Sequence, residues 1–114
     1  MKIDELFQNK KTLFSLEIFP PKKTSSIDTV YRTLDELKDV KPDFISVTYG
    51  AGGSGPERLT CKISSEIKNK YGIEPLAHLT CVNSDKEEIA GILDELKANG
   101  IENILALRGD YVAG

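Results

Sequence analysis

The sequence predicts an α/β fold of parallel strand–helix repeats, arranged as the N-terminal half, about four strands, of a (β/α)8 TIM barrel. Short apolar runs alternate with longer amphipathic segments, as in βα units. The runs begin 31, 31 and 28 residues apart (44−13, 75−44 and 103−75), which is a spacing typical of parallel strands joined by helices. Polar residues gather near the C-terminal ends of the runs, where such a barrel builds its active site. The predicted strands are residues 13–19, 44–49, 75–81 and 103–107.

The first helix between strands is predicted over residues 27–37, because its apolar residues recur on one helical face. Ser25 and Asp28 fit a capping box at its start, and residues 38–42 end it. A short helix over residues 3–7 is expected ahead of the first strand.

Two further helices follow the second and third strands. Pro56 suits a first helical turn, and Gly72 suits the position after a helix end. Ser84 and Glu87 fit a second capping box, and Gly100 again marks a helix end. No linker or low-complexity tract interrupts the repeat, so residues 1–114 are expected to form one truncated portion of a barrel that takes ~250 residues when complete.

Alternation along the strands predicts one apolar face under the helices and one face that becomes polar toward the C-terminal ends. Leu105 and Leu107 are expected on the apolar face. A four-stranded flavodoxin-like sheet is the alternative fold, although polarity on a single face disfavours it because helices bury both faces of such a sheet. The polar face is expected to carry Glu17, Thr48, His78 and Arg108.

The composition indicates a globular protein, with 39% hydrophobic and 29% charged residues. A net charge of -3 gives no reason to expect nucleic acid as a partner, and no apolar stretch approaches the ~20 residues of a membrane span. Acidic residues near the start replace the apolar core of a secretion signal, so a cytoplasmic location is expected. The two cysteines lack metal-site or redox spacing, and the sequence predicts no metal site.

Glu17 is the first candidate for chemistry. Apolar neighbours near a strand end would partly desolvate its carboxyl group, which favours the protonated form and allows proton donation near neutral pH. A structural glutamate paired with a basic side chain is an equally good interpretation at this point.

Three other strand ends carry candidate ligand-binding groups. Residues 46–55 run from a strand into a glycine-rich loop, which either approaches a ligand closely or simply connects strand to helix. His78, the only histidine, is either a ligand contact or a hydrogen-bonded structural group. Arg108 and Asp110 offer a donor fork and an acceptor, or else form a surface salt bridge.

Together these segments resemble the methylenetetrahydrofolate reductase family. The resemblance covers essentially the whole chain, and the matching segments occur in the family's order. They are Ser15-Leu-Glu-Ile-Phe-Pro-Pro-Lys22, Ser46-Val-Thr-Tyr-Gly-Ala51, Ala77-His-Leu-Thr-Cys81 and Ala106-Leu-Arg-Gly-Asp110.

The resemblance implies a barrel that holds FAD, is reduced by NADH or NADPH, and converts 5,10-methylenetetrahydrofolate to 5-methyltetrahydrofolate in one-carbon metabolism and methionine biosynthesis. Glu17 matches the family's general acid, and Asp110 also matches a residue that meets the folate. Positions matching cofactor contacts are Thr48, Tyr49, Ala51, His78, Arg108, Gly109 and Asp110.

Much of the family's flavin and folate site comes from later strands, so the 114-residue chain is expected to be inactive alone. The alternative is a non-catalytic half-barrel that self-associates through its open sheet edges. A homo-oligomer is expected in either case. Some other barrel that binds a phosphorylated ligand is a third possibility.

Overall fold

The computed structural model describes residues 2–9, 12–21, 27–49, 59–82 and 84–109. Within these ranges four parallel strands form one sheet, in the order β1-β2-β3-β4. All four overlap the predicted runs, and β1, β2 and β4 are shorter than predicted. Their bounds are Ser15–Ile18 (β1), Phe44–Val47 (β2), Glu74–Thr80 (β3) and Ile104–Leu107 (β4).

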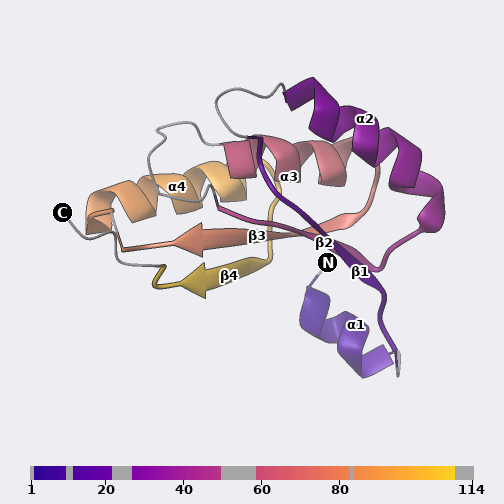
Figure 1. Ribbon diagram of the computed structural model, residues 1–114. Coiled ribbons are helices and arrows are strands. Elements are labelled where there is room, and N and C mark those ends of the chain that lie inside the picture. Colours follow the sequence, from indigo (N-terminus) through magenta and orange to yellow (C-terminus); the bar gives the residue numbers. More distant parts are fainter. Residues whose placement is uncertain (1, 10–11, 22–26, 50–58, 83, 110–114) are drawn as a thin grey trace.

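The helices that connect consecutive strands cover a single face of the sheet (Figure 1). These are α2, α3 and α4, while α1 lies on the other side of the sheet. Sequential strand order with the crossover helices on one face is the winding of a barrel, and it excludes the flavodoxin-like alternative. The predicted half of a TIM barrel is therefore confirmed. The bounds are Ile3–Asn9 (α1), Ile27–Leu37 (α2), Leu59–Asn69 (α3) and Lys86–Ala98 (α4), with a short 3-10 helix at Lys38–Val40.

The hydrophobic core fills the layer between the sheet and these helices. It consists of two clusters, one under α2 and α3 and one between α3, α4 and β3. Each fully buried aliphatic side chain contributes roughly 1.5–3 kcal/mol, so this layer holds the helices on the sheet. The first cluster contains Ile18, Val30, Leu34, Ile45, Val47, Ile63 and Ile67, and the second contains Cys61, Ala77, Leu96 and Ile101.

The predicted side-chain alternation is wrong in β4. The register pairs Ala77 with Ile104 and His78 with Leu105. Ile104 accordingly packs against the second core cluster, under the helices. Leu105 and Leu107 lie on the opposite face of the sheet, which α2, α3 and α4 leave uncovered (the open face). They are 40% and 38% exposed. The strand sequence is apolar at both parities, so hydrophobicity alone could not select the register.

The helix ends at Gly72 and Gly100 agree with prediction, whereas α1 runs to Asn9 rather than residue 7 and the start of α4 differs. Gly72 and Gly100 have left-handed φ values of 66° and 80°, as predicted for residues after a helix. The N-cap of α4, however, is Asp85, whose side chain accepts a hydrogen bond from the Glu88 amide at 2.8 Å. The capping box predicted at Ser84 is thus displaced by one residue. Ser25 and Pro56 lie outside the described residues.

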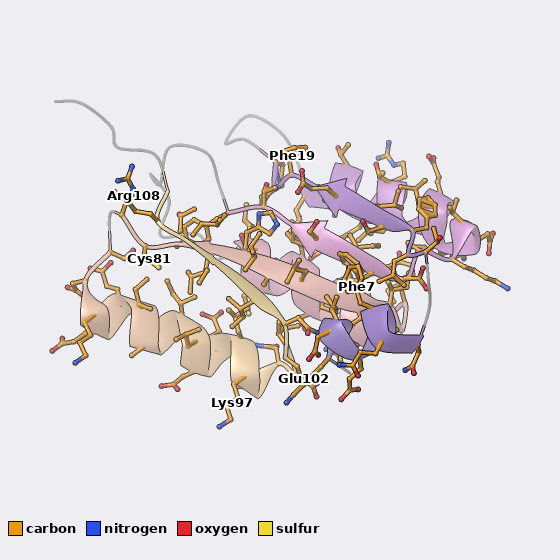
Figure 2. The ribbon with its side chains drawn as sticks, turned by 90° about the horizontal axis from the view of Figure 1, so that it is seen from below. Phe7, Phe19, Cys81, Lys97, Glu102 and Arg108 are labelled. Carbon is orange, nitrogen blue, oxygen red and sulfur yellow. The ribbon has the colours of Figure 1, made fainter. Side chains whose placement is uncertain are left out.

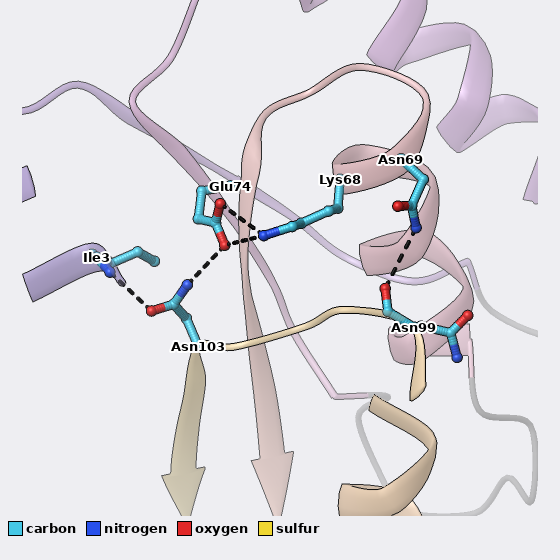
Figure 3. A network of polar contacts seen from close by, with 6 residues as sticks. All are labelled: Ile3, Lys68, Asn69, Glu74, Asn99 and Asn103. Atoms are coloured by element: carbon cyan, nitrogen blue, oxygen red, sulfur yellow. Dashed lines mark hydrogen bonds and ion pairs between the residues drawn. The ribbon is translucent and has the colours of Figure 1, made fainter. Parts of the chain in front are cut away.

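At the amino-terminal end of the sheet, a polar network ties α1, α3, β3 and β4 together (Figure 3). Lys68 Nζ donates to both carboxylate oxygens of Glu74, at 2.9 and 3.1 Å. Asn103 Nδ2 donates to Glu74 Oε1 at 3.0 Å, and the Ile3 amide donates to Asn103 Oδ1 at 2.9 Å. The first helix is thereby held against the start of β4. Among the described residues, no helix is both long and apolar enough to cross a membrane.

Candidate functional site

Three polar side chains from neighbouring strands meet on the open face of the sheet. Glu17 of β1 is the register partner of Ser46 of β2, so their side chains lie side by side. Ser46 Oγ donates toward Glu17 Oε1 at 3.5 Å, and His78 Nε2 of β3 lies 3.8 Å from the same oxygen. The fold therefore brings Glu17 and His78 together, as their alternation predicted.

The three side chains differ in exposure. Ser46 is 9% exposed and the His78 side chain 12%, whereas the Glu17 side chain is 48% exposed. About half of the Glu17 side chain is therefore covered within the described part of the chain, which is less than for its two neighbours. The reason is that β1 is an edge strand of this sheet, with β2 on one side only.

Thr48 follows β2 directly and is half-buried. Its amide donates to the carbonyl of Ile18 at 3.0 Å, which extends the pairing of β1 and β2 by one residue. Its carbonyl accepts from the Thr60 hydroxyl of α3 at 2.9 Å. These two hydrogen bonds fix the backbone at the end of β2, next to the contact between Glu17 and Ser46.

Tyr49 lies at a small hollow between the end of β2 and helices α3 and α4. The hollow is partly open to solvent and has room for little more than one water molecule. It adjoins the contact described above, because His78 lines it and also lies 3.8 Å from Glu17. The lining residues are Tyr49, Thr60, Cys61, His78, Ile92 and Leu96.

Arg108 is exposed just beyond β4, at the same end of the sheet as Cys81 (Figure 2). Its carbonyl accepts from the Cys81 amide at 3.3 Å. Arg108 follows Leu107, the last residue of β4 in the register, and its side chain is exposed. That it shares the face of Glu17 remains a prediction.

Gly109 has a left-handed φ of 91°. A Cβ atom there would lie 3.0 Å from Val82 Cγ1 and 3.1 Å from Thr80 Cβ. Both the conformation and the space thus require glycine. This residue lets the chain leaving β4 pack closely on the chain leaving β3.

The two remaining predicted positions, Ala51 and Asp110, lie outside the described residues. Two residues not singled out from the sequence also contribute to the site. Ser46 contacts Glu17, and strand alternation could have identified it because both residues have the same parity. Thr60 anchors the end of β2 from a helix, and no sequence pattern indicated that contact.

Comparison with known proteins identifies the family. Residues 2–114 match the sequence profile of the family described as methylenetetrahydrofolate reductase. The chain is 41% identical over 109 residues to a probable methylenetetrahydrofolate reductase (NADH) of Oryza sativa subsp. japonica, covering 96% of this chain and 18% of that protein. It is 40% identical over 109 residues to methylenetetrahydrofolate reductase (NADH) 1 of Arabidopsis thaliana, with the same coverage of 96% and 18%.

A bacterial relative gives a similar match. The 5,10-methylenetetrahydrofolate reductase of Escherichia coli (strain K12) is 41% identical over 100 residues, which are 88% of this chain and 33% of that protein. The chain thus spans a third or less of the length of these relatives. Since the family match extends over nearly every residue, the chain belongs to the methylenetetrahydrofolate reductase family.

Proposed function

We propose that residues 1–114 are the N-terminal portion of the catalytic barrel of an FAD-dependent oxidoreductase. The enzyme reduces 5,10-methylenetetrahydrofolate to 5-methyltetrahydrofolate with NADH or NADPH in the cytoplasm. The observation that carries this proposal is the contact of Glu17 with Ser46 and His78 on the open face of a sheet that belongs to this family. The names of the rice and Arabidopsis relatives favour NADH as the reductant.

The described residues fit a flavin ring in their chemistry. Such a ring has a hydrogen-bonding half and an apolar half. On the open face, His78 offers a ring nitrogen, while Leu105 and Leu107 present exposed apolar surface on the neighbouring strand. The flavin would supply the hydride chemistry. Residues proposed to hold it are Thr48, Tyr49, Ala51, His78, Arg108, Gly109 and Asp110, and Asp110 would also meet the folate.

Glu17 would act as the general acid. The five-membered ring of the folate opens when a C–N bond breaks, its electron pair stays on nitrogen, and that nitrogen takes a proton from the Glu17 carboxyl group. The resulting iminium ion can then accept hydride. A half-exposed carboxyl group on the open face can reach a substrate there without rearrangement of the sheet.

Glu17→Gln in the full-length protein tests this role. We expect folate-dependent reoxidation of the flavin to fall by at least about 100-fold, the usual contribution of a general acid, while flavin reduction by NADH persists. Glu36→Gln, at an exposed position of α2, is the matched control and should leave both half-reactions unchanged. Normal folate reduction by Glu17→Gln would disprove the acid role.

The alternative is a non-catalytic half-barrel that self-associates. Both β1 and β4 are edge strands, and Leu105 and Leu107 are exposed beside one edge. We propose that the 114-residue chain forms homo-oligomers and is inactive alone. Adding FAD and NADH to the chain separates the possibilities, because NADH-dependent bleaching of flavin absorbance would show that the chain itself is active.

A further inference from the structure

The two oxygens of the Glu17 carboxyl group lie in different surroundings. Ser46 Oγ and His78 Nε2 both approach Oε1, at 3.5 and 3.8 Å. Oε2 has no hydrogen-bond partner among the residues that the structure describes. One oxygen therefore faces two possible donors on β2 and β3, and the other remains available to a third group.

Ser46 is suited to hold Glu17 because it is nearly buried and the Glu17 carboxylate is an acceptor within its reach. It is 9% exposed, and within the described residues its hydroxyl has Glu17 Oε1 as its hydrogen-bond partner. A buried hydroxyl without a hydrogen-bond partner is destabilising, so the contact with Glu17 is favoured. The register places the two Cα atoms opposite each other, so the pair is built into the sheet.

We propose that Ser46 is a positioning residue for Glu17, assisted by His78, and that the donated proton resides on Oε2. This inference rests on the proposed acid role of Glu17. When the Oε2–H bond breaks, its electron pair stays on the carboxylate and the proton forms an N–H bond on the substrate. The hydroxyl of Ser46 and the N–H of His78 then donate to Oε1 and stabilise the charge that remains. Contacts of this kind are often long before substrate binds and shorten in the complex.

Another serine provides a matched control. Ser15 has the same strand parity as Glu17, two residues earlier on β1, but it is exposed and pairs with Phe44 in the register. Within the described residues, Ser15 makes no side-chain hydrogen bond to Glu17, in contrast to Ser46. Replacing Ser15 by alanine therefore removes a hydroxyl from the same face without disturbing the acid.

The kinetic test uses the full-length protein with FAD bound. Ser46→Ala is expected to slow folate-dependent flavin reoxidation about tenfold, with flavin reduction by NADH within about twofold of the parent and little change in the KM for folate. Ser46→Thr keeps the hydroxyl and should restore most of the rate. Ser15→Ala should behave like the parent.

The possible results are distinguishable. If Glu17→Gln abolishes folate reduction but Ser46→Ala does not slow it, the positioning role is wrong and the acid role stands. Equal losses in both half-reactions of Ser46→Ala would show a structural role and would also overturn the inference. If Glu17→Gln keeps full folate reduction, both proposals fail together.

A second measurement needs no activity. His78 is the only histidine in the chain, so its ring gives one set of NMR signals. Glu17→Gln should shift the ring signals of His78 at constant pH, because the carboxylate lies 3.8 Å from Nε2, and Ser15→Ala should leave them in place. Unchanged His78 ring signals in Glu17→Gln would show that His78 does not contact Glu17 Oε1 and would contradict its assisting role.

Discussion

The two ends of the sheet differ in how their polar groups are satisfied. At the amino-terminal end, Glu74 accepts three hydrogen bonds of 2.9–3.1 Å from Lys68 and Asn103. At the carboxyl-terminal end, the contacts of Glu17 are 3.5 and 3.8 Å long, and half of its side chain is exposed. The first carboxylate is fully engaged in holding the fold, whereas the second has capacity left for a ligand. TIM barrels in general have a stabilising amino-terminal end and carry their active sites at the carboxyl-terminal ends of their strands.

The charge state of the amino-terminal network follows from the same geometry. The hydrogen bonds to Glu74 raise the pKa of Lys68 above its ordinary value of 10.5, and burial opposes this only in part. A raised pKa in the folded protein means that the pair stabilises the fold fully below pH 10.5. The stabilisation is lost as the pH rises through the higher folded-state pKa. The network therefore remains intact throughout the physiological range.

The largest effect is expected when the amino-terminal network is broken. Glu74→Ala removes the acceptor of both Lys68 and Asn103 and leaves a partly buried ammonium group without its carboxylate, at a cost of about 2–3 kcal/mol in unfolding free energy. Urea denaturation measures this. Glu66→Ala, which removes a 3.6 Å pair with Lys70 along α3, is the control and should cost far less. Equal losses of unfolding free energy in Glu74→Ala and Glu66→Ala would show that Glu74 stabilises the fold no more than an ion pair along a helix surface does.

A smaller effect is expected at the carboxyl-terminal end, from backbone packing. Gly109→Ala forces a Cβ against Thr80 and Val82 at a left-handed φ and should cost about 1–2 kcal/mol. Gly91 lies within α4 with open space around it, so Gly91→Ala should instead stabilise the protein by about 0.5–1 kcal/mol. Thermal unfolding of both variants tests the pair. Stabilisation by Gly109→Ala would show that the β3 and β4 ends do not pack as described.

The smallest effect concerns the cap of α4, also at the carboxyl-terminal end. Asp85→Ala should lower the unfolding free energy by about 1 kcal/mol, because the Glu88 amide loses its acceptor. Ser84→Ala should change it little. If Ser84→Ala proved the more costly substitution, the capping box predicted from sequence would be the better description.

The sequence was most informative where apolar and polar residues alternated clearly along a strand. Strand spacing predicted all four strands, and the alternation in β1 and β3 placed Glu17 and His78 on one face. In β4, apolar residues at both parities left the register undetermined, so Leu105 and Leu107 were assigned to the wrong face. At α4, adjacent Ser84 and Asp85 are both good caps, which explains the error of one residue.

The long-range polar contacts could not be predicted from the sequence. Lys68, Glu74 and Asn103 come from three different elements, and no local pattern relates them. The extent of Glu17 burial could not be read from the sequence either, because apolar neighbours along a strand do not determine what covers a side chain on an edge strand. The fold was therefore more predictable than the surroundings of Glu17.

The bond between Ile3 and Asn103 has a consequence for the order of folding. It joins residues 100 positions apart, so α1 cannot dock on the start of β4 until almost the whole described chain has been made. At 5–20 residues per second, synthesis of that intervening stretch takes about 5–20 s. During this interval the first helix must wait without its β4 partner. Since α1 is only seven residues long, before β4 arrives it depends on contacts such as the packing of the Phe7 ring on Phe44 of β2 to stay helical.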